Sequence, residues 1–344
     1  DLKEKLSNIL VAYNKKGEPV YLKDLKIEGV ITSLLKDAIK PNIVQTLENN
    51  PAIIHGGPFA SIAHGCNSIL ATKTALKFAD YVITEAGFGA DLGAEKFLNI
   101  KCRKAGLKPK AAVVVATVKA LKLHGDIEEK DLKEENLEAL AKGVQNLEKH
   151  IENLRKFNLP IVVALNVFVT DTEKELAFLE NWAKEQGVEF SRTEVWEKGG
   201  LGGIDLAEKV VKAVEGNDKE LQLLYKDEAS ITEKIETVCS EIYGADGVNF
   251  SDEVKAEIER IERLGFKHLP VCMAKTPASL TDNAKIKGRP TGFNITINDV
   301  KLRSGAGFVV AYANKVLTMP GLPKVPSALN IDIDEETETI VGIF

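Results

Sequence analysis

Two large aromatic residues follow neighbouring predicted strands, at the point where each strand ends. Phe168 follows the apolar run at 161–167, and Trp196 follows the next predicted strand along the chain. Open α/β sheets bind ligands just beyond the carboxyl ends of their strands, because loops and helix amino termini converge there. Two rings at this edge could hold a flat heterocycle between them, each stack contributing about 0.5 to 1.5 kcal/mol beyond area burial. The alternative is that both belong to the core, a role for which Trp182, on the apolar face of a predicted helix, is better placed.

A glycine-rich loop follows the apolar run at 81–85. Gly87, Gly89 and Gly93 give the pattern G-x-G-x-x-x-G, one residue longer than the dinucleotide fingerprint G-x-G-x-x-G. The pattern is weakly diagnostic, and a tight turn with close helix packing explains it as well. Phe88 stands between two of the glycines, so we expect it on the outer surface of the loop, where it could touch a ligand.

Two further loops carry residues that could bind an anion or a metal. Lys198 precedes the glycines at 199–203, which resembles an anion cradle. His55, His64 and Cys66 could be metal ligands, but their spacing lacks the short repeated intervals and the fourth ligand of a zinc site. We therefore expect no metal site there, with His64 bonded to backbone or directed at an anionic substrate.

Several well-defined catalytic motifs are absent from the sequence. It contains no G-x-x-x-x-G-K-[ST], the loop whose lysine and hydroxyl hold nucleotide phosphates and magnesium. It also contains no G-x-S-x-G, which leaves a serine hydrolase with little support.

From residue 51 the chain alternates short apolar runs with segments of helix length, the pattern of βαβ units. Near-continuous apolar runs indicate parallel strands covered on both faces, so the prediction is α/β, a doubly wound, mostly parallel sheet. Thr172 and Glu175 have the spacing of a capping box. We expect strands at 52–55, 81–85, 111–118 and 161–167, and helices at 42–48, 66–78, 94–104, 135–157 and 172–186.

The pattern changes near residue 216. Helices are expected at 231–243 and 251–264, then an apolar strand at 269–274 and partly solvent-facing strands at 294–298 and 308–312. We predict three parts: residues 1–148, an α/β domain; residues 149–244, a second α/β domain; and residues 245–344, a smaller α+β domain.

Composition excludes other classes of protein. The 344 residues are 44% hydrophobic and 28% charged, which suits two or three globular domains. A net charge of −6 argues against nucleic acid or anionic lipid as a partner, and the apolar runs are too short to span a bilayer. Four widely spaced cysteines indicate free, buried thiols and hence a reducing, cytoplasmic compartment.

Three long segments resemble formate–tetrahydrofolate ligases. They are KDAIKPNIVQTLEN at 36–49, HGGPFASIAHGCN at 55–67 and TEAGFGADLGAEKF at 84–97. The resemblance continues in the family's order through shorter segments, which are NLEKHIEN at 146–153, TDTE at 170–173, YGADG at 243–247, LPVCMAK at 269–275, GAGF at 305–308 and MPGLP at 319–323.

The resemblance implies an enzyme that joins formate, ATP with Mg²⁺ and tetrahydrofolate through formyl phosphate, in an oligomer activated by a monovalent cation. It implies that Phe168 and Trp196 sandwich the pterin ring and that Phe88 borders the same cleft. It further implies cofactor contacts for Gly87, Gly89, Leu92 and Ala60. The family's P-loop, which would carry the catalytic groups, is expected on an amino-terminal segment upstream of Asp1. By this resemblance residues 1–148 are the remainder of a P-loop NTPase-like, nucleotide-binding domain, and residues 149–244 are a folate-binding domain.

The sequence departs from the family pattern beside the expected folate pocket. Val167 and Val169 stand where the family often has a basic residue and a proline, and Leu201 stands where it has a glutamate. We expect pterin affinity or anchoring of the glutamate tail to differ accordingly. Two other functions stay open: a non-catalytic folate-binding or assembly subunit, and, from the glycine loop, a nicotinamide-dependent oxidoreductase.

Overall fold

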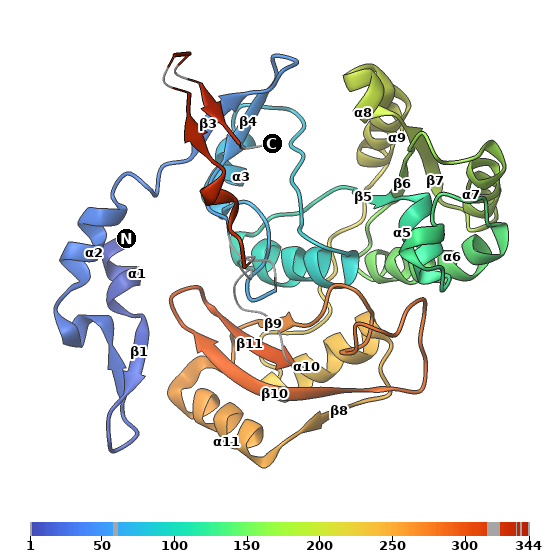
Figure 1. The fold of residues 1–344 in the computed structure, drawn as a ribbon. Helices are drawn as coiled ribbons and strands as arrows, with labels where there is room; N and C mark the ends of the chain where they lie inside the picture. The colour runs from blue at the N-terminus through green and yellow to red at the C-terminus, as the bar shows by residue number, and fades with distance from the viewer. Residues whose placement is uncertain (1, 58–60, 315–323, 335, 338, 343–344) are drawn as a thin grey trace.

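The computed structural model describes residues 2–57, 61–314, 324–334, 336–337 and 339–342 (Figure 1). In this part of the chain the two largest sheets are a parallel sheet of three strands and a mixed sheet of four. The fold is therefore α/β with a parallel sheet, as expected, but a mixed sheet and antiparallel pairs accompany it.

The parallel sheet has the order β5-β6-β7, formed by β5 (Ala112–Ala116), β6 (Ile161–Asn166) and β7 (Glu189–Thr193). The central strand is buried over its first five residues, which explains its unbroken apolar sequence. The strands expected at 111–118 and 161–167 are confirmed. This sheet joins a strand from the predicted first part of the chain to two strands from the predicted second part.

Four helices surround this sheet: α5 (Val118–His124), α6 (Leu137–Arg155), α7 (Glu173–Glu185) and α9 (Ile204–Glu215). α6 packs on β5 and β6, whereas α9 packs on β6 and β7. The predicted capping box of Thr172 and Glu175 is present at the start of α7. On β5, Val113 and Val115 are 40% and 68% exposed, so one face of this edge strand is uncovered.

The mixed sheet has the order β8-β10-β11-β9, formed by β8 (Gly247–Phe250), β10 (Asn294–Arg303), β11 (Phe308–Ala313) and β9 (Val271–Ala274). β10 and β11 are antiparallel, and the outer strands run parallel to their neighbours. β10 alternates between exposed and buried residues, as predicted. β11 is instead buried on both faces except at the partly exposed Tyr312, so the expectation of a partly solvent-facing strand at 308–312 is wrong. α10 (Ile231–Val238) and α11 (Asp252–Ile261) pack on this sheet.

The amino-terminal part contains α1 (Leu2–Ser7), β1 (Leu10–Tyr13), β2 (Pro19–Tyr21), α2 (Glu28–Leu35), β3 (Asn42–Gln45), β4 (Pro51–Ile54) and α3 (Ile69–Ala75). β3 and β4 form an antiparallel hairpin, so the helix expected at 42–48 is wrong and the strand at 52–55 is not parallel. Asn49, with φ of +64°, accounts for the tight turn, because asparagine tolerates this left-handed backbone better than most residues.

The strand expected at 81–85 is also wrong. The segment is extended chain without a strand partner among the described residues, and Ile83 is 90% exposed. Tyr81 is tied to the end of α9 by a 2.9 Å hydrogen bond from its hydroxyl to Glu215. A strand forms only where a neighbouring strand pairs with its backbone, which an apolar sequence alone does not provide.

The helix expected at 94–104 is present, but much of it has π-helical turns: η2 (Ala90–Ala94), η3 (Phe97–Cys102) and then α4 (Arg103–Ala105). Polar side chains here are deeply buried; Glu95 and Asn99 have no exposed surface and are joined by a 2.8 Å hydrogen bond. The remaining short elements are η1 (Leu22–Leu25), η4 (Glu129–Asp131), α8 (Val195–Lys198), η5 (Gly199–Gly203), η6 (Cys239–Tyr243), η7 (Glu262–Phe266), η8 (Ser327–Leu329), β12 (Asp332–Ile333) and β13 (Ile340–Val341).

Burial of Glu95 predicts a pH-dependent stability. Desolvation raises the pKa of its carboxyl to about 7, so the folded chain keeps a proton there that the unfolded chain releases above its ordinary pKa of 4.5. This contribution to stability is complete below about pH 4.5 and is lost as the pH rises through about 7. We expect Glu95→Gln to gain on the order of 3 kcal/mol relative to the parent between pH 5 and pH 8, measured by urea unfolding. Glu208→Gln, at an exposed carboxylate, is the control; a pH-independent difference for Glu95→Gln would contradict the prediction.

Candidate functional site

Three strand ends lie side by side at the carboxyl edge of the parallel sheet. In register, Ala116 pairs with Leu165, and Asn166 pairs with Thr193. The amide of Val167 extends this pairing by donating to the carbonyl of Thr193 over 3.0 Å. The segments that leave β5, β6 and β7 therefore start from neighbouring points, which is where α/β sheets bind ligands.

Both aromatic residues predicted at this edge lie at the surface. Phe168, two residues beyond β6, is 36% exposed, and Trp196, in α8 beyond β7, is 89% exposed. Trp182, by contrast, belongs to the hydrophobic core, as predicted. The two surface rings are thus accessible to a ligand.

A closed turn holds Phe168 in place. Its amide donates to Oδ2 of Asp171 over 2.9 Å, and the amide of Asp171 donates back to the Phe168 carbonyl over 2.9 Å. Burial raises the pKa of the Asp171 carboxyl, an effect that the Phe168 amide partly offsets. The ammonium of Lys119, near the start of α5, lies 4.6 Å from the centre of the Phe168 ring.

A buried ion pair anchors the end of this turn. Nζ of Lys122 lies 2.9 Å from Oε1 of Glu175, and neither side chain is more than 1% exposed. The same carboxylate accepts the amides of Asn136 and Thr172, each over 3.1 Å, which joins α5 to the starts of α6 and α7. The sequence identified Glu175 as a capping residue but gave no indication that its partner is Lys122.

The glycines near Trp196 already contact a carboxylate of this chain. The amide of Gly200 donates to Oε1 of Glu48, at the tip of the β3–β4 hairpin, over 2.6 Å. Lys198, expected to help hold an anion, is paired with Glu194 of the preceding turn. Leu201 is 79% exposed, so this surface carries an apolar side chain as well as charged ones.

The loop with Gly87, Gly89 and Gly93 is tightly closed. A side chain at Gly93 would approach the carbonyl oxygen of Gly87 to 2.0 Å. The amides of Gly87, Leu92 and Gly93 donate to carbonyls of Gly65 and Gly89, so these amides are not free to bind phosphate. Leu92 is fully buried in the core, and Ala60 lies outside the described residues.

Phe88 projects from this loop, as expected, with 48% of its surface exposed. Its φ of +68° is unfavourable for a bulky side chain, and such backbone strain clusters at functional sites. Within the described part of the chain, this loop contacts α6 and the segment after β9, and not Phe168 or Trp196.

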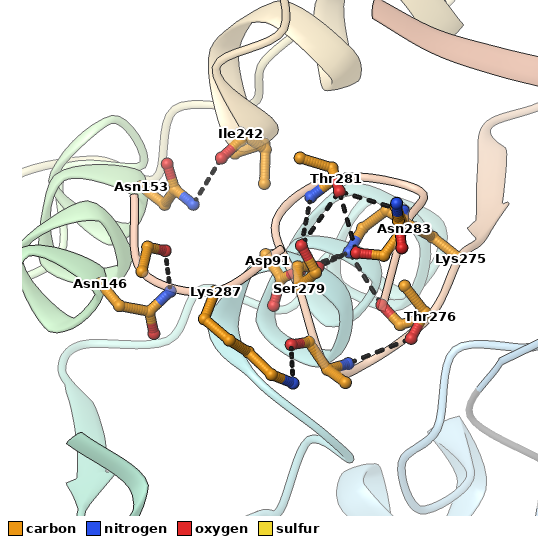
Figure 2. Close-up of polar contacts among 12 residues, drawn as sticks. Asp91, Asn146, Asn153, Ile242, Lys275, Thr276, Ser279, Thr281, Asn283 and Lys287 are labelled. Carbon is orange, nitrogen blue, oxygen red and sulfur yellow. Dashed lines mark hydrogen bonds and ion pairs between the residues drawn. The ribbon is translucent and has the colours of Figure 1, made fainter. Parts of the chain in front are cut away.

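Figure 2 shows how the glycine loop is fixed to the carboxy-terminal part. Lys275 is fully buried, its Nζ 3.1 Å from Oδ2 of Asp91, and it also donates to the carbonyls of Thr276 and Ser279. The ring of Tyr243 lies 4.9 Å from the same ammonium. No motif in the sequence predicted this junction. Its one sequence signal is Lys275, a lysine directly after the apolar run of β9.

The residues considered as metal ligands have other partners. His55 bonds the Ser68 hydroxyl over 2.7 Å and the Ala38 carbonyl over 2.9 Å, whereas Nδ1 of His64 lies 3.2 Å from the thiol of Cys66. Within the described part of the chain, no group of three or more His, Cys, Asp or Glu side chains could hold a metal. The four cysteines are free and buried, as expected. None of the described helices is long and apolar enough to cross a membrane.

The buried ion pair of Lys122 and Glu175 predicts how strongly each substitution below lowers the free energy of unfolding. Lys122→Met leaves the Glu175 carboxylate buried without its counter-charge, so we expect a loss of about 3 to 5 kcal/mol in the free energy of unfolding, measured with urea. Lys142→Met removes an exposed pair with Glu138 and should change stability by less than about 0.5 kcal/mol. Equal effects of the two substitutions would contradict the assigned role of Lys122.

Comparison with known proteins agrees with the resemblance of the sequence segments. The family model described as formate–tetrahydrofolate ligase matches residues 1–344. The match therefore includes the strand ends that carry Phe168 and Trp196, the glycine loop and the mixed sheet. This chain belongs to the formate–tetrahydrofolate ligase family.

Proposed function

We propose that this chain supplies the folate-binding side of an enzyme that makes 10-formyltetrahydrofolate, ADP and phosphate. Its family carries out the ATP-dependent ligation of formate and tetrahydrofolate. The observation that carries the proposal is the pair of exposed rings, Phe168 and Trp196, that follow adjacent parallel strands. A pterin ring is flat and aromatic, so stacking on these rings is the interaction that the site can provide.

The reaction in this proposal passes through formyl phosphate, whose carbonyl is attacked by N10 of the folate. ATP enters with Mg²⁺, and the exposed ring of Phe88 and the adjacent Gly87 and Gly89 are proposed to border its site. Leu92 has no exposed surface, so we assign it no contact with a ligand. Since the amides of Gly87, Leu92 and Gly93 are already bonded within the chain, we assign contact with the phosphates elsewhere.

The phosphate site in this proposal lies on an amino-terminal segment that carries the P-loop. Two observations support this assignment. The sequence contains no G-x-x-x-x-G-K-[ST], and β5 exposes Val113 and Val115 at the edge of a parallel sheet, where a further strand and helix would cover them. Oligomer formation and a monovalent cation site are proposed from family membership.

Removing either ring tests the folate site. We expect Phe168→Ala and Trp196→Ala each to weaken tetrahydrofolate binding by about tenfold, because each substitution removes one stacking surface of 0.5 to 1.5 kcal/mol together with buried apolar area. Isothermal titration calorimetry of the 344-residue chain measures the effect. Phe78→Ala, at a ring 80% exposed outside this edge, is the matched control. Unchanged affinity in both variants would overturn the assignment of the pterin site.

Reconstitution tests whether this chain binds the folate while a separate amino-terminal segment binds the phosphates. The 344-residue chain alone should form no 10-formyltetrahydrofolate from formate, ATP and tetrahydrofolate, because it lacks a phosphate-binding loop. Addition of the P-loop segment of a family member should restore product formation, followed by the absorbance of the folate product after acid conversion. A mixture that binds ATP and tetrahydrofolate but stays inactive would instead favour a non-catalytic folate-binding subunit.

A further inference from the structure

We propose that Lys119 is a ligand-binding residue whose ammonium binds an oxyanion group of the substrate that stacks on Phe168. The inference rests on the proposed function, since it takes Phe168 as a stacking surface. The oxyanion is a carboxylate of the folate glutamate, whose charged oxygens accept hydrogen bonds from an ammonium.

Lys119 lies at the third of three neighbouring strand ends. It belongs to the first turn of α5, directly after β5, whereas Phe168 follows β6 and Trp196 follows β7. Because β5 and β6 are paired in parallel up to Ala116 and Leu165, Lys119 and Phe168 emerge beside each other. The 4.6 Å between the ammonium and the ring centre agrees with this placement.

The ammonium of Lys119 has no carboxylate within salt-bridge distance among the described residues. The ammonium contacts the Phe168 ring and slightly lowers the pKa of Asp171. The Asp171 carboxylate already accepts a hydrogen bond from the Phe168 amide. The side chain is half-buried. By contrast, the nearby Lys122 and Lys174 are both paired with glutamates.

A cation over an aromatic ring at a partly exposed site is held weakly, whereas a charge-assisted hydrogen bond to an oxyanion is stronger. The lysine stem has four rotatable carbons, so the ammonium can leave the ring when a ligand arrives. A ligand whose heterocycle stacks on Phe168 and whose tail carries carboxylates then meets an ammonium that has no carboxylate partner among the described residues. The ammonium lies over the ring before binding and is proposed to pair with the carboxylate afterwards.

Calorimetric binding to the 344-residue chain tests this inference, with tetrahydrofolate and inorganic phosphate titrated separately. We expect Lys119→Met to weaken tetrahydrofolate binding by about tenfold and Lys119→Arg to stay within about threefold of the parent, with phosphate binding unchanged in both. High salt should weaken tetrahydrofolate binding to the parent more than to the methionine variant, because the lost contact is ionic. A loss confined to tetrahydrofolate supports the carboxylate contact, and a loss confined to phosphate overturns it. Lys142→Met is the control for loss of an unrelated surface charge, and thermal unfolding confirms that each variant is folded.

Two outcomes separate the failure of this inference from failure of the proposed function. If Phe168→Ala weakens tetrahydrofolate binding but Lys119→Met binds both ligands as the parent does, Lys119 is not a binding residue and the folate site stands. If the parent chain binds neither ligand, the proposed function fails and the inference fails with it.

Discussion

Parallel pairing of β5, β6 and β7 determines where the side chains of the proposed folate site lie. Parallel strands point their carboxyl ends to one edge of the sheet, so residues separated by up to about eighty positions in sequence are brought to that edge. Lys119, Phe168 and Trp196 follow these three strand ends. Were one strand reversed, its residue would lie at the opposite end of the sheet, away from the other two.

Buried charged side chains hold the segments at the carboxyl edge of the parallel sheet in place. Glu175 satisfies two backbone amides and one ammonium, so a single carboxylate holds the starts of two helices and the turn that ends at Asp171. Lys275 has a similar role after β9, where it holds the glycine loop through Asp91. Each of these charges is costly to bury and is tolerated because its hydrogen bonds are satisfied. These pairs therefore fix geometry more than they add stability.

The two candidate ligand regions have different physical properties. At the strand ends the rings of Phe168 and Trp196 are open to solvent, which suits stacking of a planar organic ligand. In the glycine loop the close approach of Gly93 to Gly87 uses the backbone for packing, and the strained, exposed Phe88 is the feature that faces outward. This contrast supports a division in which this chain holds the folate and another segment holds the phosphates.

The sequence determined the local features of this protein. The apolar run of β6 predicted a buried parallel strand, the Thr172 capping box predicted the start of α7, and the motifs identified the family. Tertiary structure decided what depends on contacts between distant residues. Residues 81–85 have a strand sequence but no strand partner among the described residues. Residues 42–45 pair with β4 where a helix was expected at 42–48, and Lys122 pairs with Glu175 fifty-three positions away. Periodicity and capping are encoded within a few neighbouring residues, whereas strand pairing and buried ion pairs depend on which distant segments pack together.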